Sequence, residues 1–176
     1  MVSRFACGLA IAVAAMVAGG AATAQEESTN QVAAKTAWSV FEDTDPRECW
    51  VVSAPTETVN TRDDRVVAVR RGDILLMAFY RPEAGVDGQV TFTGGYPFAE
   101  GSTVNVSIGD DEFEMFTEGE WAWPASTEDD ARMIEAMKGG IDAVLTARST
   151  RGTTTKDTFS LLGFTAALDE AQSRCE

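Results

Sequence analysis

The chain has 176 residues, of which 14 are Lys or Arg and 28 are Asp or Glu, so its net charge is −14 at neutral pH. This excess of negative charge argues against nucleic acid or an anionic lipid surface as a partner, because both would repel the chain. The chain has no histidine, which excludes a Ser-His-Asp triad, a Cys-His dyad and a histidine-bound metal ion. Its length and its 44% content of hydrophobic residues fit one domain with a buried core.

Residues 1–24 have the pattern of a secretory signal peptide. Arg4 supplies the positive charge, an apolar run extends from Leu9 to Val17, and Ala22-Thr23-Ala24 is a small-x-small cleavage site. The apolar run is shorter than the roughly 20 residues that span a bilayer. We therefore expect cleavage after Ala24, a periplasmic or secreted location, and no stable membrane insertion of the exported chain.

Two cysteines follow this segment, Cys49 and Cys175. In an oxidising compartment an isolated pair most simply forms one disulfide, and two free thiols are the alternative. A disulfide would fasten the C-terminal end of the chain to an early strand.

The remaining chain is predicted to consist of a flexible, polar lead-in over residues 25–36 and one domain over residues 37–176. From Trp38 on, short apolar runs alternate with turn residues every eight to twelve positions, which is typical of a β-sandwich or barrel. The predicted strands are 38–41, 49–54, 66–70, 74–80, 89–93, 103–108, 112–117, 143–147 and 154–161. Hairpin turns are expected at Gly109-Asp110 and at Arg71-Gly72-Asp73.

Two short helices are predicted among these strands. The first has Ser126 as its N-cap, acidic residues in its first turn, and Gly139-Gly140 at its end. The second follows Gly163 and ends near the C-terminus. Its apolar residues recur at helical spacing and include Cys175, which places that cysteine on the buried face.

Three segments of the chain resemble a known family. They are Trp38-Ser39-Val40, Gly94-Gly95-Tyr96-Pro97-Phe98, and the run from Phe159 to Leu168, FSLLGFTAAL, which is the most specific. Together they resemble the invasion-associated locus B proteins, a bacterial secreted or periplasmic family, and the chain looks like a short subgroup of it. The resemblance implies an immunoglobulin-like β-sandwich and a role associated with host-cell invasion in pathogenic members. It supplies no catalytic residues.

Trp121-Ala122-Trp123 is the sequence feature most suggestive of binding. Alternation along a strand puts both indoles on the same side. The favoured interpretation is that both pack in the core or under the first helix. The alternative is a binding patch formed by Trp121 and Trp123, since aromatic residues supply much of the binding energy of interfaces.

Charged segments allow further alternatives. The acidic groups around Asp43 and around Asp110 could hold calcium, although neither has EF-hand spacing. The basic stretch from Arg62 to Arg71 is interpreted as a solvated face, with an anion-binding surface as the alternative. Within it, Arg71-Gly72-Asp73 matches an integrin-recognition tripeptide but is interpreted as a turn.

The leading hypothesis is an exported, non-catalytic β-sandwich that acts through a protein partner in the envelope or on a host surface. We expect no catalytic residue, no metal ion and no cofactor. The first alternative is a periplasmic protein that binds a small ligand or calcium. The second is a hydrolase that uses a pair of carboxylates.

Overall fold

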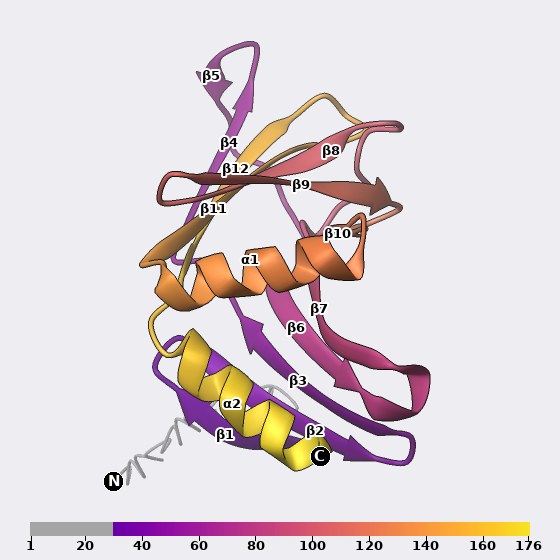
Figure 1. Cartoon of the computed structure of the whole chain (residues 1–176). Coiled ribbons are helices and arrows are strands. Elements are labelled where there is room, and N and C mark those ends of the chain that lie inside the picture. The colour runs from indigo at the N-terminus through magenta and orange to yellow at the C-terminus, as the bar shows by residue number, and fades with distance from the viewer. Residues whose placement is uncertain (1–29) are drawn as a thin grey trace, which may run out of the picture.

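The strands within residues 30–176 form one antiparallel sheet of twelve members (Figure 1). The computed structural model describes these residues, and the predicted signal peptide lies outside them. The strand order across the sheet is β1-β2-β3-β6-β7-β10-β9-β8-β11-β12-β4-β5. The strands are β1 (Gln31–Lys35), β2 (Trp38–Thr44), β3 (Arg47–Ser53), β4 (Glu57–Arg62), β5 (Arg65–Val66), β6 (Leu75–Arg81), β7 (Val86–Thr93), β8 (Thr103–Ile108), β9 (Asp111–Glu118), β10 (Trp121–Pro124), β11 (Asp142–Arg148) and β12 (Thr154–Ser160). The helices are η1 (Pro82–Ala84), α1 (Thr127–Gly139) and α2 (Phe164–Cys175).

The sheet curls so that its two halves enclose the core. Figure 1 shows β1, β2, β3, β6 and β7 in the lower half and β8, β9, β11 and β12 in the upper half. Phe92 of β7 meets Phe159 of β12 edge to face, with ring centroids 6.1 Å apart. Trp38 of β2 donates a hydrogen bond from its indole to the carbonyl oxygen of Ser160, at 3.0 Å. The predicted mainly β, sandwich-like fold is therefore confirmed, and its two halves belong to one continuous sheet.

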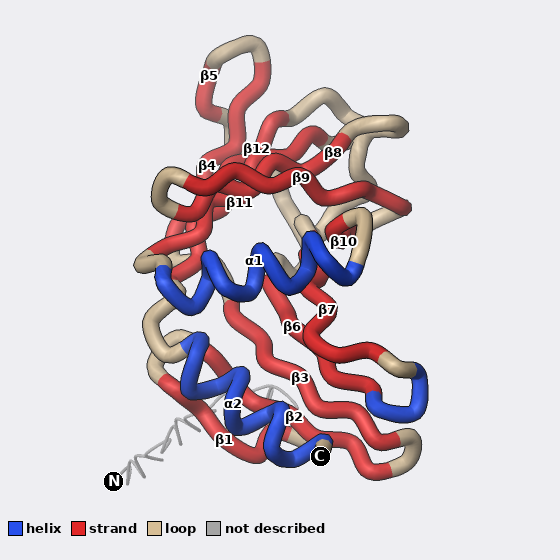
Figure 2. The backbone as a smooth tube through the Cα atoms, in the orientation of Figure 1, coloured by secondary structure: helices blue, strands red, loops and turns tan. Residues whose placement is uncertain are grey.

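Both predicted helices are present, and they pack against the inner side of the curled sheet (Figure 2). Ser126 caps α1 as expected, because its side chain accepts a hydrogen bond from the backbone N–H of Asp129. Asp130 then accepts a hydrogen bond from the backbone N–H of Val90 at 2.8 Å, which fastens α1 to β7. Gly88 permits this close approach, since a Cβ there would lie 2.8 Å from the Ile134 side chain.

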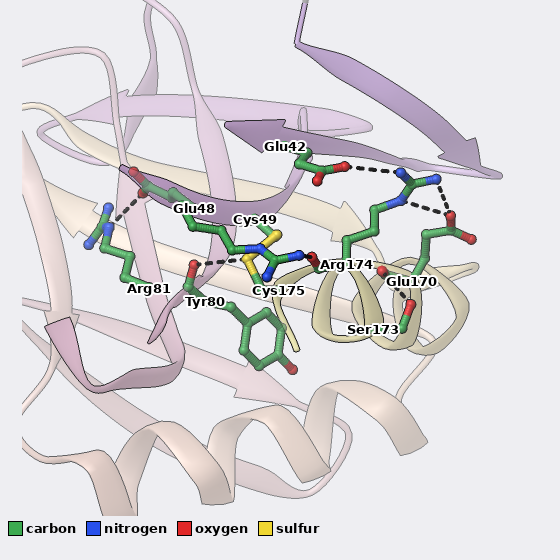
Figure 3. Close-up of a disulfide and its surroundings, with 10 residues drawn as sticks. Glu42, Glu48, Cys49, Tyr80, Arg81, Glu170, Ser173, Arg174 and Cys175 are labelled. Atoms are coloured by element: carbon green, nitrogen blue, oxygen red, sulfur yellow. Dashed lines mark hydrogen bonds and ion pairs between the residues drawn. A yellow bond between two sulfur atoms is a disulfide. The ribbon is translucent and has the colours of Figure 1, made fainter. Parts of the chain in front are cut away.

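Helix α2 is joined to β3 by a disulfide between Cys175 and Cys49 (Figure 3). The two Cα atoms are 5.9 Å apart, and both cysteines are buried. The adjacent Arg174 pairs with Glu42 of β2 and with Glu170 of its own helix. The C-terminal helix is thus held to the first strands by a covalent bond and by ion pairs at its edge.

Two sequence predictions about local structure are wrong. Residues 31–35 were expected to belong to a flexible lead-in, but they form β1, because their backbone pairs with β2 and extends the sheet. The hairpin expected at Arg71-Gly72-Asp73 is also absent from residues 30–176. The strand before it is only β5, which pairs with β4, whereas β6 after it pairs with β3 and β7. By contrast, the turn at Gly109-Asp110 does join β8 to β9.

Candidate functional site: the aromatic face of the sheet

A row of aromatic side chains crosses the outer side of the lower half-sheet. Trp50 alternates along β3 with buried Cys49 and Val51, so it points away from the core. Its neighbours across the sheet are Phe41 on β2 and Phe79 on β6. The Phe41 and Trp50 rings are nearly parallel with centroids 5.4 Å apart, and the Trp50 and Phe79 centroids are 6.3 Å apart.

The row continues to β10, where Trp121 is 45% exposed and Trp123 is half-buried. Both indoles are on the opposite side of β10 from buried Ala122. Together with Phe79, Arg81, Gln89 and Thr91, they line an open hollow of about 370 Å³. The favoured core interpretation of this pair is therefore wrong for Trp121, and the structure joins it to aromatic residues from distant strands.

The row ends at Phe116 on β9, which is 51% exposed and directly opposite Trp123. Opposite residues of antiparallel strands share a face, so Phe116 belongs to the same surface. We call this surface the aromatic face. It consists of Phe41, Trp50, Phe79, Phe116, Trp121 and Trp123.

Charged side chains border the aromatic face. Arg81 lies over the Phe79 ring, 4.4 Å from its centroid, and pairs with Glu48. At the other end Glu118 is opposite Trp121, and Glu114 precedes Phe116 by two residues on the same side of β9. The surface thus combines apolar area at its centre with a predominantly acidic edge.

The described residues give no support to the calcium alternative, and the two buried carboxylates with raised pKa values have partners within the fold. Within residues 30–176, no group of three or more His, Cys, Asp or Glu side chains is arranged to hold a metal ion. Burial raises the pKa of Asp130, and the hydrogen bond from Val90 opposes this shift. Burial likewise raises the pKa of Asp157, against the effect of hydrogen bonds from Arg71. Each carboxylate thus has a partner within the fold, and neither lines the hollow beside Trp121.

Comparison with known proteins identifies the family. A family model described as Invasion associated locus B (IalB) protein matches residues 38–172, which include every residue of the aromatic face. The chain belongs to the IalB family. The crystal structure of invasion associated protein B from Bartonella henselae is similar in fold, with a TM-score of 0.52 and 15% sequence identity. This similarity covers 80% of the present chain and 95% of the Bartonella chain. Comparison with curated proteins gave no match.

In this IalB-family chain, Arg71-Gly72-Asp73 does not present its arginine to solvent. The Arg71 side chain is only 6% exposed and forms an ion pair with Asp157. It also donates a hydrogen bond to the carbonyl oxygen of Gly94, and Gly72 donates one to Gly95. Gly72 and Asp73 are exposed, but the Arg71 side chain is held within the fold and is not presented to a receptor.

Sequence reasoning missed most of the aromatic face of this IalB-family protein. The sequence pattern placed Trp38 and Trp50 in the predicted strands 38–41 and 49–54 without singling out Trp50 as a surface residue, and only Trp38 is in the core, at 1% exposure. The alternation of side chains along β3 could have revealed that Trp50 points outward. Successive residues of a strand point to opposite sides, so Trp50 cannot face the core together with its neighbours Cys49 and Val51. The cross-strand neighbours of Trp50 could not be derived without the register of the sheet.

Proposed function

We propose that this protein is an exported, non-catalytic binding module that uses its aromatic face to contact a basic protein in the cell envelope or on a host surface. The observation that carries the proposal is the exposed Trp121, which adjoins half-buried Trp123 in an open hollow lined by residues of β6, β7 and β10. Contiguous exposed apolar surface of this kind commonly marks an interaction site.

The composition of the surface supports a protein as the occupant. Tryptophan is enriched among the residues that dominate binding energy at protein interfaces, as is arginine, and both are present in the hollow. The stacked rings of Phe41, Trp50 and Phe79 hold one another in place. They therefore offer a preformed contact area whose ordering costs little conformational entropy on binding.

The negative charge of the chain and of the border of the aromatic face supports a basic protein as the partner. The chain carries a net charge of −14, and Glu114 and Glu118 border the aromatic face. Such a field accelerates the encounter with a positively charged protein and repels an acidic one. A basic surface with an apolar centre would be complementary to this face in both respects.

Export is supported by the signal-peptide pattern of residues 1–24 and by the Cys49–Cys175 disulfide, since disulfides persist mainly outside the cytoplasm. Within residues 30–176 no helix is long and apolar enough to cross a membrane. Membership of a family named for invasion is consistent with a host-surface partner.

Affinity capture with matched variants tests the proposal. Immobilised wild-type protein, Trp121→Ser and Phe116→Ser are exposed to extract of the producing cell's envelope and, separately, to host-cell surface proteins. Ile141→Ser is the control, because Ile141 is 72% exposed but does not belong to the aromatic face. We expect a basic protein that the wild type and Ile141→Ser retain and both aromatic-face variants lose. Equal retention by all four proteins, or capture of acidic proteins alone, would contradict the proposal.

A further inference from the structure

A second cavity, of about 490 Å³, has a lining that shares no residue with the hollow beside Trp121. It opens between the end of β4, the loop that precedes β6, and the turn between β11 and β12. Four arginines line it, Arg62, Arg70, Arg71 and Arg151, and Glu120 is the carboxylate among its lining residues. This concentration of arginine is unusual in a chain whose net charge is −14.

One of these arginines is part of the framework of the cavity. Arg71 is neutralised by its ion pair with Asp157, and its guanidinium lies over the Tyr96 ring, 5.0 Å from the centroid. The Tyr96 hydroxyl in turn hydrogen-bonds to Thr155, at 2.5 Å. Thr153 and Thr155 are buried hydroxyl residues, 4% and 1% exposed, in the cavity lining. The cavity therefore has a rigid wall made from β12 and the segment after β7.

The other three arginines are available to a ligand. Among the described residues, none of Arg62, Arg70 and Arg151 forms an ion pair. Arg62 donates one hydrogen bond to Thr153 at 2.7 Å, which holds it beside the cavity. The ion pair with Asp157 neutralises the charge of Arg71, and the negative charge of Glu120 offsets one of the three remaining arginines. The lining therefore has a net excess of two positive charges.

We propose that this cavity binds the phosphate group of a small, soluble phosphate ester. A phosphate monoester carries a charge of about −1.5 to −2 at neutral pH and three acceptor oxygens, which matches the charge excess and the guanidinium donors. The cavity is larger than phosphate alone requires, and Tyr96 and Pro97 give it an apolar wall for the organic part of the ligand. The acidity of the whole chain disfavours a phospholipid bilayer as the source of this group.

Isothermal titration calorimetry tests the assignment, with glycerol 3-phosphate, inorganic phosphate and phosphatidylglycerol vesicles as separate probes. The variants are Arg70→Gln and Arg151→Gln, neither of which breaks an ion pair within the described residues. Arg65→Gln is the matched control, because Arg65 belongs to the adjacent β5 but does not line the cavity. Melting temperatures check that all four proteins are equally folded.

We expect the wild type and Arg65→Gln to bind glycerol 3-phosphate more tightly than inorganic phosphate. Each cavity variant should lose about tenfold in affinity, as removal of a charge-assisted hydrogen bond predicts. The assignment is overturned if no soluble probe binds, if Arg65→Gln weakens binding as much as Arg70→Gln, or if only the vesicles bind.

Discussion

Arg71 and Asp157 form a buried bidentate ion pair, in which Nη1 lies 2.7 Å from Oδ1 and Nη2 lies 2.6 Å from Oδ2. The two side chains are 6% and 0% exposed. Arg71 also contacts Gly94 and Asn60 through hydrogen bonds. The pair thus fastens the loop that precedes β6 to β12 and to the segment after β7, on which the wall of the arginine-lined cavity depends.

Removing one member of this pair should destabilise the protein strongly. In Asp157→Asn the buried guanidinium of Arg71 loses its counter-charge, and we expect the free energy of unfolding to fall by about 3–5 kcal/mol. Urea denaturation at neutral pH measures this loss. Glu135→Gln is the control, because it breaks an exposed pair with Lys138 that is worth at most about 1 kcal/mol.

Replacing both members of the pair should reduce the stability of the protein much less than the two single replacements predict. The double variant Arg71→Met with Asp157→Leu leaves no unpaired charge in the interior, so its loss of stability should be well below the sum of the two single losses. Additive losses in this cycle would show that Arg71 and Asp157 contribute independently.

The disulfide should contribute substantially to stability by linking residues far apart in the sequence. In the double variant Cys49→Ala with Cys175→Ala, we expect the free energy of unfolding to fall by about 2–5 kcal/mol. Urea denaturation with and without reductant measures the change. Reductant should lower the stability of the wild type and leave the double variant unaffected. Two thiols titrated in the unreduced, unfolded wild-type protein would contradict the assignment.

Asp130 should give the protein a distinctive dependence of stability on pH. Burial raises its pKa in the folded state above the ordinary value of 3.8, so the folded protein binds the proton more tightly than the unfolded chain. Its contribution to stability therefore decreases as the pH rises from about 3.8 through the folded-state pKa. Asp130→Asn keeps an oxygen for the Val90 N–H and removes this titration.

Urea denaturation at pH 4 and pH 7 checks this expectation. The free energy of unfolding of Asp130→Asn, measured relative to that of the wild type, should be higher at pH 7 than at pH 4. Glu128→Gln is the control, since Glu128 is exposed in the same first turn of α1. An equal loss of stability at both pH values would contradict the role assigned to Asp130.

Local sequence signals predicted the elements that depend on local chemistry. Ser126 and the following acidic residues indicated the start of α1, and the spacing of Phe164, Ala167, Leu168 and Ala171 indicated the buried face of α2. Strand β4 escaped prediction because Glu57–Arg62 is mostly polar. Its backbone pairing with β12 defines it as a strand, and no alternation of apolar residues reveals that pairing.

Long-range relationships could not be predicted in the same way. A glycine between charged residues is typical of a hairpin turn, so Arg71-Gly72-Asp73 was assigned to one. The residue that determines the role of Arg71 is Asp157, 86 positions away. Similarly, alternation placed Trp121 and Trp123 on one side of a strand but did not indicate whether that side was the core. Which side of β10 faces the core depends on the curl of the sheet and on the position of α1.

The central claim is that the aromatic face binds a basic protein, and the affinity of the captured partner for Trp121→Ser tests it most directly. Surface plasmon resonance compares the wild type, Trp121→Ser and the exposed control Ile141→Ser at equal salt concentration. Loss of a tryptophan at the centre of an interface commonly costs at least about 2 kcal/mol, which corresponds to roughly a 30-fold weaker Kd. We predict this weakening for Trp121→Ser and an unchanged Kd for Ile141→Ser. An unchanged Kd for Trp121→Ser would contradict the account.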